Sequence, residues 1–292
     1  MRQRTLSEYL QERYGTKLYK VSINGGFTCP NRDGTLGEKG CIFCSGNGSG
    51  DFAEDPDLSI TEQIEAGKKR IQAKSPGSLG GYIAYFQAFT NTYAPVDRLR
   101  KLYTEAIRHP DVKILSIATR PDCLGEDVLG LLSELNEIKP VWVELGLQTI
   151  HEKTAAYIRR GYPLSVFDDA LKRLQDKHLE TIVHVILGLP GETREEMLET
   201  VRYVGKSGAE GIKLQLLHVL KGTDLADDFA AGKFTCLTEE EYTELIRDAL
   251  AVLPAAIVIH RMTGDGSKKD LIAPLWSADK KHVLNRLHKI LT

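Results

Sequence analysis

Short apolar segments recur along the chain with helical segments between them, and this alternation constrains the fold more than any other feature. Strands are expected at residues 18–23, 82–86, 113–118, 141–147, 181–187, 211–219 and 256–261. Helices, in which apolar residues recur at three- and four-residue spacing, are expected at 60–71, 96–108, 126–135, 166–178, 194–204 and 239–253. Strands that alternate with helices are typical of a parallel sheet, and 292 residues suit a single α/β barrel.

Two residues stand where helix N-caps are expected, Asp97 and Thr193, since both precede helical periodicity. No apolar run approaches the ~20 residues that cross a bilayer, and the first residues lack the apolar core of a secretion signal. We therefore expect a cytoplasmic protein with no membrane partner. Five cysteines, an odd number, fit a reducing compartment better than a disulfide framework.

Three of these cysteines, Cys29, Cys41 and Cys44, lie in one glycine-rich loop after the first expected strand. Thiolates are the usual ligands of iron-sulfur clusters, and three of them leave one iron of a [4Fe-4S] cube open to a small molecule. The alternative is a structural zinc, which needs four ligands, normally as two close pairs. Only Cys41 and Cys44 form such a pair, and no histidine precedes residue 109. The ligand count and spacing favour the cluster.

Charge is unevenly distributed along the chain. The formal net charge is −2 at pH 7, which disfavours strong nonspecific binding to nucleic acid. Residues 1–20 nevertheless hold five lysines and arginines against two glutamates, and residues 261–292 hold seven against three aspartates. If both ends meet at one edge of the barrel, they form a positive patch for phosphates; otherwise they are solvated helix faces.

Polar residues gather after the expected strands, where the functional groups of such barrels collect. Four motifs follow in order: Cys29-x11-Cys41-Ile-Phe-Cys44, Ala118-Thr-Arg-Pro-Asp122, Glu144-Leu-Gly-Leu-Gln-Thr149 and Gly188-Leu-Pro-Gly-Glu-Thr193. Together they resemble the motifs of the radical S-adenosylmethionine enzymes. The resemblance extends from about residue 9 to residue 291. Within that superfamily the chain is most similar to the Elongator-like branch, in its stand-alone bacterial YtqA/YhcC type.

The resemblance implies an α/β fold with a partial TIM-type (β/α)6 barrel, in a single domain of residues 1–292. The core would span about residues 17–220, with an N-terminal helix in the extension 1–16 and a strand-helix extension at 221–292. It also implies a [4Fe-4S] cluster on Cys29, Cys41 and Cys44, whose open iron binds S-adenosyl-L-methionine. One electron, from a donor such as flavodoxin or ferredoxin, then yields a 5′-deoxyadenosyl radical that abstracts hydrogen from the substrate.

Further cofactor contacts follow from the same resemblance. Many relatives hold the methionyl amine with a Gly-Gly-Glu stretch, where this chain has Phe86-Gln-Ala-Phe-Thr-Asn91, so Gln87 or Thr90 is the expected substitute. The other expected contacts are Gln148, Arg160, His184 and the turn at Gly188. Each of these four also has a purely structural interpretation, respectively as a strand-end amide, a solvated cation, a core histidine and a tight turn.

The resemblance points to tRNA as the partner, and more narrowly to the carbon-5 side chain of the wobble uridine. The implied step trims a carboxymethylaminomethyl group toward aminomethyl. Two other classes stay open on the sequence: a zinc-stabilised RNA-binding module, and a cluster- or haem-binding chaperone that does not consume S-adenosylmethionine. Metal analysis would distinguish the zinc-stabilised module from the enzyme. Formation of 5′-deoxyadenosine would distinguish the enzyme from the chaperone.

The first prediction follows from the ligand count. Cys29→Ala, Cys41→Ala and Cys44→Ala should each abolish cluster binding, because two thiolates hold the cube poorly. Cys123→Ala and Cys236→Ala, the controls, should retain iron, labile sulfide and activity. Iron and sulfide analysis of anaerobically prepared protein is the measurement, and loss of the cluster in either control would contradict the assignment of an open iron.

Overall fold

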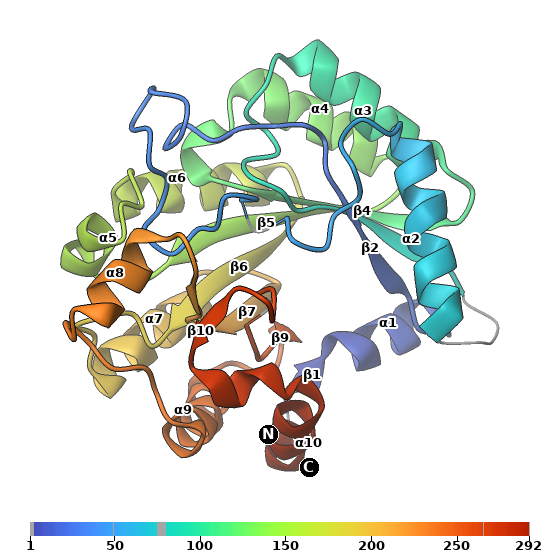
Figure 1. The fold of residues 1–292 in the computed structure, drawn as a ribbon. Coiled ribbons are helices and arrows are strands. Elements are labelled where there is room, and N and C mark those ends of the chain that lie inside the picture. Colours follow the sequence, from blue (N-terminus) through green and yellow to red (C-terminus); the bar gives the residue numbers. More distant parts are fainter. Residues whose placement is uncertain (1–2, 49, 75–79, 265, 292) are drawn as a thin grey trace.

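The computed structural model describes residues 3–48, 50–74, 80–264 and 266–291. Its centre is a curled, fully parallel sheet in the order β1-β9-β7-β6-β5-β4-β3-β2 (Figure 1). The strands are β1 (Arg4–Thr5), β2 (Tyr19–Ile23), β3 (Tyr82–Phe86), β4 (Val112–Thr119), β5 (Val141–Gln148), β6 (Glu180–Leu187), β7 (Gly211–Leu216) and β9 (Val258–Arg261). The expected α/β partial barrel is confirmed: β2 to β7 are neighbours in chain order, and β9 and β1 extend the sheet.

Helices follow the strands around the outside of the curled sheet (Figure 1). They are α1 (Leu6–Tyr14), α2 (Ile60–Lys74), α3 (Val96–Arg108), α4 (Glu126–Asn136), α5 (Glu152–Tyr157), α6 (Leu164–Asp176), α7 (Arg194–Lys206), α8 (Asp224–Ala230), α9 (Glu239–Val252) and α10 (Lys280–Leu291). The largest hydrophobic core lies between these helices and the sheet. Within the described residues, no helix combines the length and apolarity that crossing a bilayer requires.

Local chemistry explains where expected and observed elements agree or differ. Thr193 caps α7 as expected, because its side chain accepts from the Glu196 amide and the Glu196 side chain accepts in return. The cap expected at Asp97 is wrong, since Pro95 is the N-cap of α3 and Asp97 lies in the first turn, where its charge favours the helix N-terminus. The expected strand at 211–219 ends at Leu216, and a separate strand, β8 (Val219–Leu220), pairs antiparallel with β10 (Leu271–Ala273).

Helix α1 closes the end of the barrel at which the strands begin. Its Leu10 is buried in a cluster with Trp142, Ile182 and other residues from the starts of the strands. The Tyr9 ring lies 6.1 Å from that of Trp142, near the start of β5. The lumen is therefore filled at this end by apolar and aromatic side chains, whereas the pocket described below lies at the opposite end.

This arrangement places Arg4 and Arg13 away from the C-terminal stretch, so the two basic ends of the chain do not bring all their cations into one patch. Arg4 pairs with Glu12, and Arg13 pairs with Glu180 at the start of β6, both at the closed end. The C-terminal stretch instead passes the open end, because Gly264 and Gly266 line the pocket described below.

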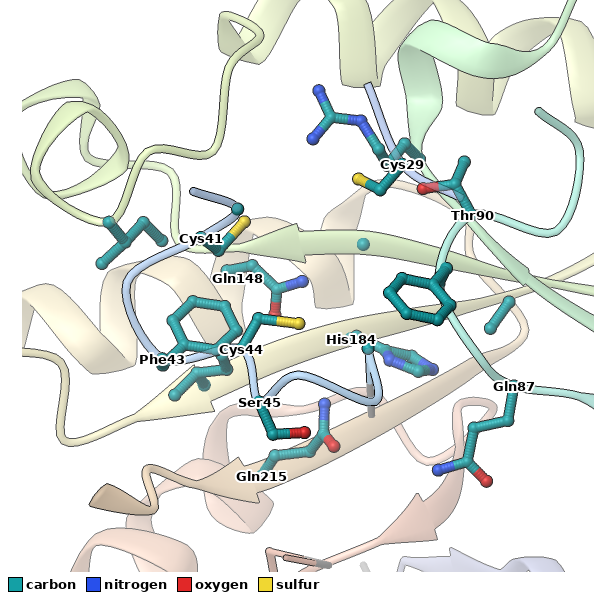
Figure 2. Close-up of a pocket in the computed structure, with 18 of the residues that line it drawn as sticks. Cys29, Cys41, Phe43, Cys44, Ser45, Gln87, Thr90, Gln148, His184 and Gln215 are labelled. Carbon is teal, nitrogen blue, oxygen red and sulfur yellow. The ribbon is translucent and has the colours of Figure 1, made fainter. Parts of the chain in front are cut away.

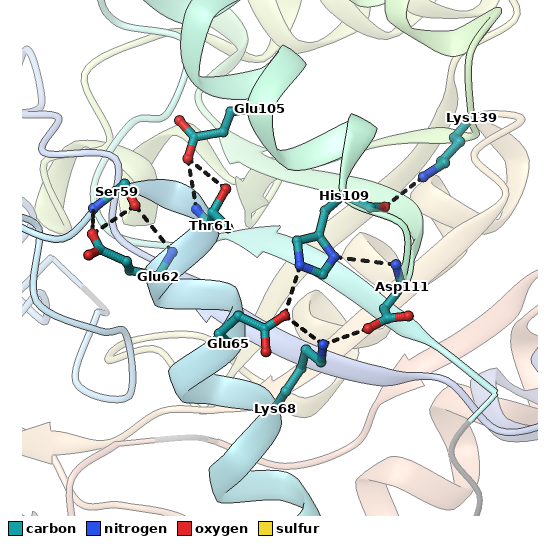
Figure 3. A network of polar contacts seen from close by, with 9 residues as sticks. All are labelled: Ser59, Thr61, Glu62, Glu65, Lys68, Glu105, His109, Asp111 and Lys139. Atoms are coloured by element: carbon teal, nitrogen blue, oxygen red, sulfur yellow. Dashed lines mark hydrogen bonds and ion pairs between the residues drawn. The ribbon is translucent and has the colours of Figure 1, made fainter.

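A polar network on the outer surface joins α2 to the start of β4 (Figure 3). The Lys68 ammonium lies between two carboxylates, 2.6 Å from Glu65 Oε1 and 2.5 Å from Asp111 Oδ2. His109 Nε2 lies 2.9 Å from the same Glu65 oxygen. Glu65, His109 and Asp111 are close enough together to hold a metal ion, but Lys68 supplies the positive charge between their carboxylates. We interpret this network as an ion-pair clamp.

The close approach of α2 to the sheet generates the second prediction. A Cβ at Gly67 would lie 2.4 Å from Val21 Cγ1, whereas a Cβ at Gly130 in α4 would meet nothing within 4 Å. Gly67→Ala should therefore destabilise the protein, since the branched Val21 side chain is stiff. Gly130→Ala should stabilise it by about 0.5–1 kcal/mol, through helix propensity. Chemical denaturation measures both, and equal effects would contradict the packing of α2 on β2.

Candidate active site

A pocket opens at the carboxyl ends of the strands, and the three loop cysteines all line it. Figure 2 shows the sulfur atoms of Cys29, Cys41 and Cys44 directed toward a common space. Of the other expected site residues, Gln87, Thr90, Gln148, Arg160 and His184 line the same pocket. Gly188 is not among the lining residues; it has the positive φ of +90° expected for its turn, and its amide donates to Met197 Sδ.

Hydrogen bonds from the loop's own polar residues hold the cysteines in place. The Asn31 amide donates to Cys41 Sγ at 3.4 Å and to the Arg159 carbonyl at 2.7 Å. Arg32 donates to the carbonyls of Cys44 and Ser45, at 2.8 and 2.7 Å. The loop is thus fixed to the turn after α5 before any metal binds. This preorganisation fits a site that must present three thiolates at once.

The environment of Cys41 disfavours a free thiolate. Burial, with Cys44 nearby, raises the pKa of Cys41 to about 12. A bound metal reverses this preference, since coordination stabilises the thiolate and releases the proton. The structure gives these three thiols a shared space and a hydrogen-bond donor, so the residues present fit a three-thiolate cluster.

The segment that replaces the Gly-Gly-Glu stretch of relatives docks directly on the cysteine loop. The Thr90 amide donates to the Thr28 carbonyl at 3.1 Å, and the Phe89 amide donates to the Gly48 carbonyl at 2.9 Å. Phe89 has φ of +61°, which is strained for a residue with a side chain. Its ring fits only because residue 48 is glycine, where a Cβ would lie 2.3 Å from it. Gln87 accepts a 3.2 Å hydrogen bond from Ser22 at the edge of the pocket.

Gln148 has two features that point to a ligand. It has φ of +69° at the end of β5, and its side-chain oxygen is buried without a hydrogen-bond partner in the protein. Gly146 makes room for it, because a Cβ there would lie 3.0 Å from Gln148 Nε2. Strained, unsatisfied groups in a pocket are typical of binding sites. Gln148 therefore fits the cofactor contact expected of it.

Arg160 is only 2% exposed, and its guanidinium donates to the protein itself. It binds the carbonyls of Tyr162, Leu147 and Thr149, at 2.9, 3.3 and 2.6 Å, and the Glu152 carboxylate at 3.2 Å. The resemblance implies a cofactor contact for Arg160, whereas these hydrogen bonds tie the end of β5 to α5. Its expected contact with the cofactor stays a prediction.

The remaining two cysteines are separate from this pocket. Neither Cys123 nor Cys236 is among its lining residues, and both are half-buried. Cys123 follows the ion pair of Arg120 with Asp122, and its thiol lies 3.8 Å from Asp122 Oδ1. Cys236 packs against a hydrophobic cluster under the pocket.

The floor of the pocket is a buried charged network that the sequence interpretation missed. Glu144, which is 1% exposed, accepts hydrogen bonds from Lys20 at 2.6 Å and Ser116 at 2.8 Å, both on Oε1. Its other oxygen pairs with His184 Nε2 at 2.7 Å and with Lys213. Lys213 also donates to the Tyr85 hydroxyl at 3.1 Å. Below this layer, the His260 ring contacts Trp142, which packs on α1.

Burial and the neighbouring charges together shift the pKa values of the groups in this network. Burial alone would raise the pKa of Glu144, but Lys20 and Lys213 hold it well below its ordinary value. Burial, followed by Lys213 and Arg261, lowers the pKa of His184 to about 4. His184 is consequently neutral at pH 7, and the carboxylate of Glu144 is ionised.

The sequence does contain a signal for this network. Side chains in a strand alternate between faces, so polar residues two apart mark the lumen side. Glu144 and Gln148 share parity on β5, as do Lys213 and Gln215 on β7. Considered alone, a lysine such as Lys213 in an apolar strand suggests an exposed edge. It became informative only once the register placed it beside His184.

Comparison with known proteins agrees with this geometry. A model of the radical SAM superfamily matches residues 26–204, and a model of the radical SAM C-terminal domain matches residues 209–292. Protein YtqA of Bacillus subtilis is 44% identical over 290 residues, covering 99% of this chain and 89% of that protein. A tRNA uridine(34) acetyltransferase of Methanocaldococcus jannaschii is 28% identical over 154 residues, covering 52% of this chain and 28% of that one. The solved structure of archaeal Elp3 from Methanocaldococcus infernus has a TM-score of 0.69 at 17% identity, covering 94% of this chain and 63% of that chain.

The chain therefore belongs to the radical SAM superfamily, with Elongator-like relatives and YtqA among its homologues. It is a radical SAM enzyme, and its cofactors are a [4Fe-4S] cluster and S-adenosylmethionine.

The third prediction tests the floor of the pocket. Glu144→Gln should lower the free energy of unfolding by about 3–5 kcal/mol, because it leaves Lys20 and Lys213 without their buried counter-charge. Glu134→Gln is the control: it breaks an exposed pair with Arg100 and should leave the free energy of unfolding nearly unchanged. Urea denaturation at pH 7 is the measurement. Equal losses for the two variants would mean that the network adds little to the stability of the barrel.

Proposed function

We propose that this enzyme modifies tRNA at the carbon-5 side chain of the wobble uridine, in a step of the carboxymethylaminomethyl-to-aminomethyl type. The observation that carries the proposal is the sequence similarity over half of the chain to a protein named for its action on uridine 34 of tRNA. The fold shared with archaeal Elp3 is consistent with it.

In this proposal Cys29, Cys41 and Cys44 ligate three irons of the cluster. Bound together, the cluster and S-adenosylmethionine supply a carbon-centred radical that takes a hydrogen atom from the substrate. Gln148 would bind a hydroxyl or amine of the cofactor with its unpaired oxygen. The further cofactor contacts that we propose are Gln87, Thr90, Arg160, His184 and the turn at Gly188.

The chain's own residues shield the reaction from water and position the substrate. Phe43, Ile158, Leu216 and Leu217 give the pocket an apolar side wall near the cysteines. Such a wall excludes water that would quench a radical, and it holds reacting atoms close together. A base must leave its stack to enter this pocket, which a single-stranded anticodon loop permits.

Positive charge near the pocket mouth suits an RNA backbone. Lys221 and Lys269 are adjacent, because Lys221 Nζ donates to the Lys269 carbonyl at 3.1 Å. Lys268 and Lys269 follow closely on Gly266, which lines the pocket. We propose that this segment contacts phosphates of the anticodon stem-loop. A flavodoxin or ferredoxin is the proposed electron donor.

The fourth prediction concerns cellular tRNA. Deleting the gene should leave the carboxymethylaminomethyl form of the wobble uridine accumulated and its aminomethyl product depleted, measured by nucleoside mass spectrometry. A plasmid copy of the gene should restore the product, and a Cys41→Ala copy should not. Unchanged wobble nucleosides in the deletion strain would refute the tRNA proposal. Reductive formation of 5′-deoxyadenosine by the purified enzyme, absent in Cys41→Ala, tests the chemistry separately.

A further inference from the structure

The side-chain amide of Asn31 lies between the cysteine loop and the turn that follows α5. Asn31 is 5% exposed, and its Nδ2 donates to the Arg159 carbonyl at 2.7 Å. The same nitrogen lies 3.4 Å from Cys41 Sγ and 3.5 Å from the Arg160 carbonyl. A carbonyl oxygen only accepts, so the short contact with Arg159 requires that the amide nitrogen, and not the amide oxygen, faces the sulfur. The amide nitrogen carries two hydrogens, and one of them is available to Cys41.

Neighbouring backbone groups hold this amide in place. The Asn31 carbonyl accepts from the Gly40 amide at 2.7 Å, and the Ile42 amide donates to the Ile158 carbonyl at 3.3 Å. Gly161 has φ of +85°, and a Cβ there would lie 2.8 Å from Asn31 Oδ1. The glycine therefore leaves the space that the amide occupies. The donor is directed at the cysteine sulfur by the fold of the protein itself, before any metal binds.

The hydrogen bonding of Cys41 must change when the cluster binds. In the metal-free protein its thiol donates to the Arg159 carbonyl, 3.5 Å away. Coordination removes the thiol proton, so the sulfur becomes an acceptor beside a carbonyl oxygen that repels it. The Asn31 N–H offsets that repulsion. Because Asn31 is almost fully buried, its hydrogen bond is electrostatically stronger than it would be in water.

We propose that Asn31 raises the reduction potential of the cluster through its N–H···S hydrogen bond to Cys41. On reduction the cluster takes up one electron from an external one-electron donor, and its negative charge increases by one. A hydrogen-bond donor at a ligand sulfur stabilises the more negative state more strongly, so the potential becomes less negative. Asn31 is a positioning residue, since it acts through Cys41. The inference goes beyond the proposed function and does not depend on the substrate.

The fifth prediction concerns anaerobically loaded protein without S-adenosylmethionine. Asn31→Leu keeps a side chain of similar size and removes the donor. It should shift the reduction equilibrium about tenfold toward the oxidised cluster, which corresponds to ~59 mV for one electron. Asn31→Ser, which keeps a smaller donor, should shift the equilibrium less. Redox titration with dithionite, followed by electron paramagnetic resonance, is the measurement.

Asn91→Leu is the matched control. Asn91 is also buried, and its amide donates at 2.8 Å to the Ala118 carbonyl rather than to a sulfur. This variant should change the reduction equilibrium less than about twofold, because it removes a buried amide without changing the hydrogen bonds of the cluster ligands. Iron and sulfide analysis and circular dichroism check that each variant is loaded and folded.

A second measurement needs no variant. Asparagine labelled with heavy nitrogen in its side-chain amide is incorporated into the wild-type protein, and the reduced cluster is studied by electron–nuclear double resonance. A labelled nitrogen coupled to the cluster is the expected result, and it supports the inference even if Asn31→Leu does not bind a cluster. Absence of that coupling would overturn the hydrogen bond.

The titrations can also contradict the inference. An unchanged potential in Asn31→Leu would show that the amide does not affect the cluster. Equal shifts in Asn31→Leu and Asn91→Leu would show that any buried amide near the loop has the same effect, again against the inference. Neither result bears on the tRNA proposal, which the deletion strain tests separately.

Discussion

One buried carboxylate connects most of the barrel. Glu144 on β5 binds groups from β2, β4, β6 and β7 at once, so a single side chain joins five of the eight strands through the lumen. A charge this deeply buried is tolerated only when it is paired and fully hydrogen-bonded. The network therefore constrains the register of those strands, and with it the positions of the residues that follow them.

That constraint links stability to chemistry. The strands whose inward residues meet at Glu144 end in the residues around the cysteine loop. Gln148 lies four residues beyond Glu144 on the same face of β5, with a strained backbone and an unsatisfied oxygen. The strain and the missing partner at Gln148 are tolerable because the strand beneath it is anchored. A binding site is expected to combine a rigid supporting network, such as that of Glu144, with unsatisfied groups that face the ligand, such as Gln148.

Periodicity and motif order predicted β2 to β6 and five of the six expected helices to within two residues, because each of these elements has a strong apolar pattern. The three cysteines were equally evident, since a loop with three thiols has few structural explanations. The Glu144 network was not evident, because Lys20, Lys213 and His184 are far apart in sequence and meet only through register. Arg160 shows a further limit: the resemblance suggested a cofactor contact, and only the fold reveals the three carbonyls to which it donates.

Helix α1 has a consequence for the order of events in catalysis. Because it packs against one end of the barrel, the pocket lies at the other end, and in the proposed function both cofactor and substrate would enter there. An RNA stem-loop seated across that entrance would trap whatever is already inside. In the proposed function, S-adenosylmethionine would then load first, and its products would depart after the RNA has dissociated. Binding and release would then follow a compulsory order. An excess of RNA would slow the exchange of the cofactor.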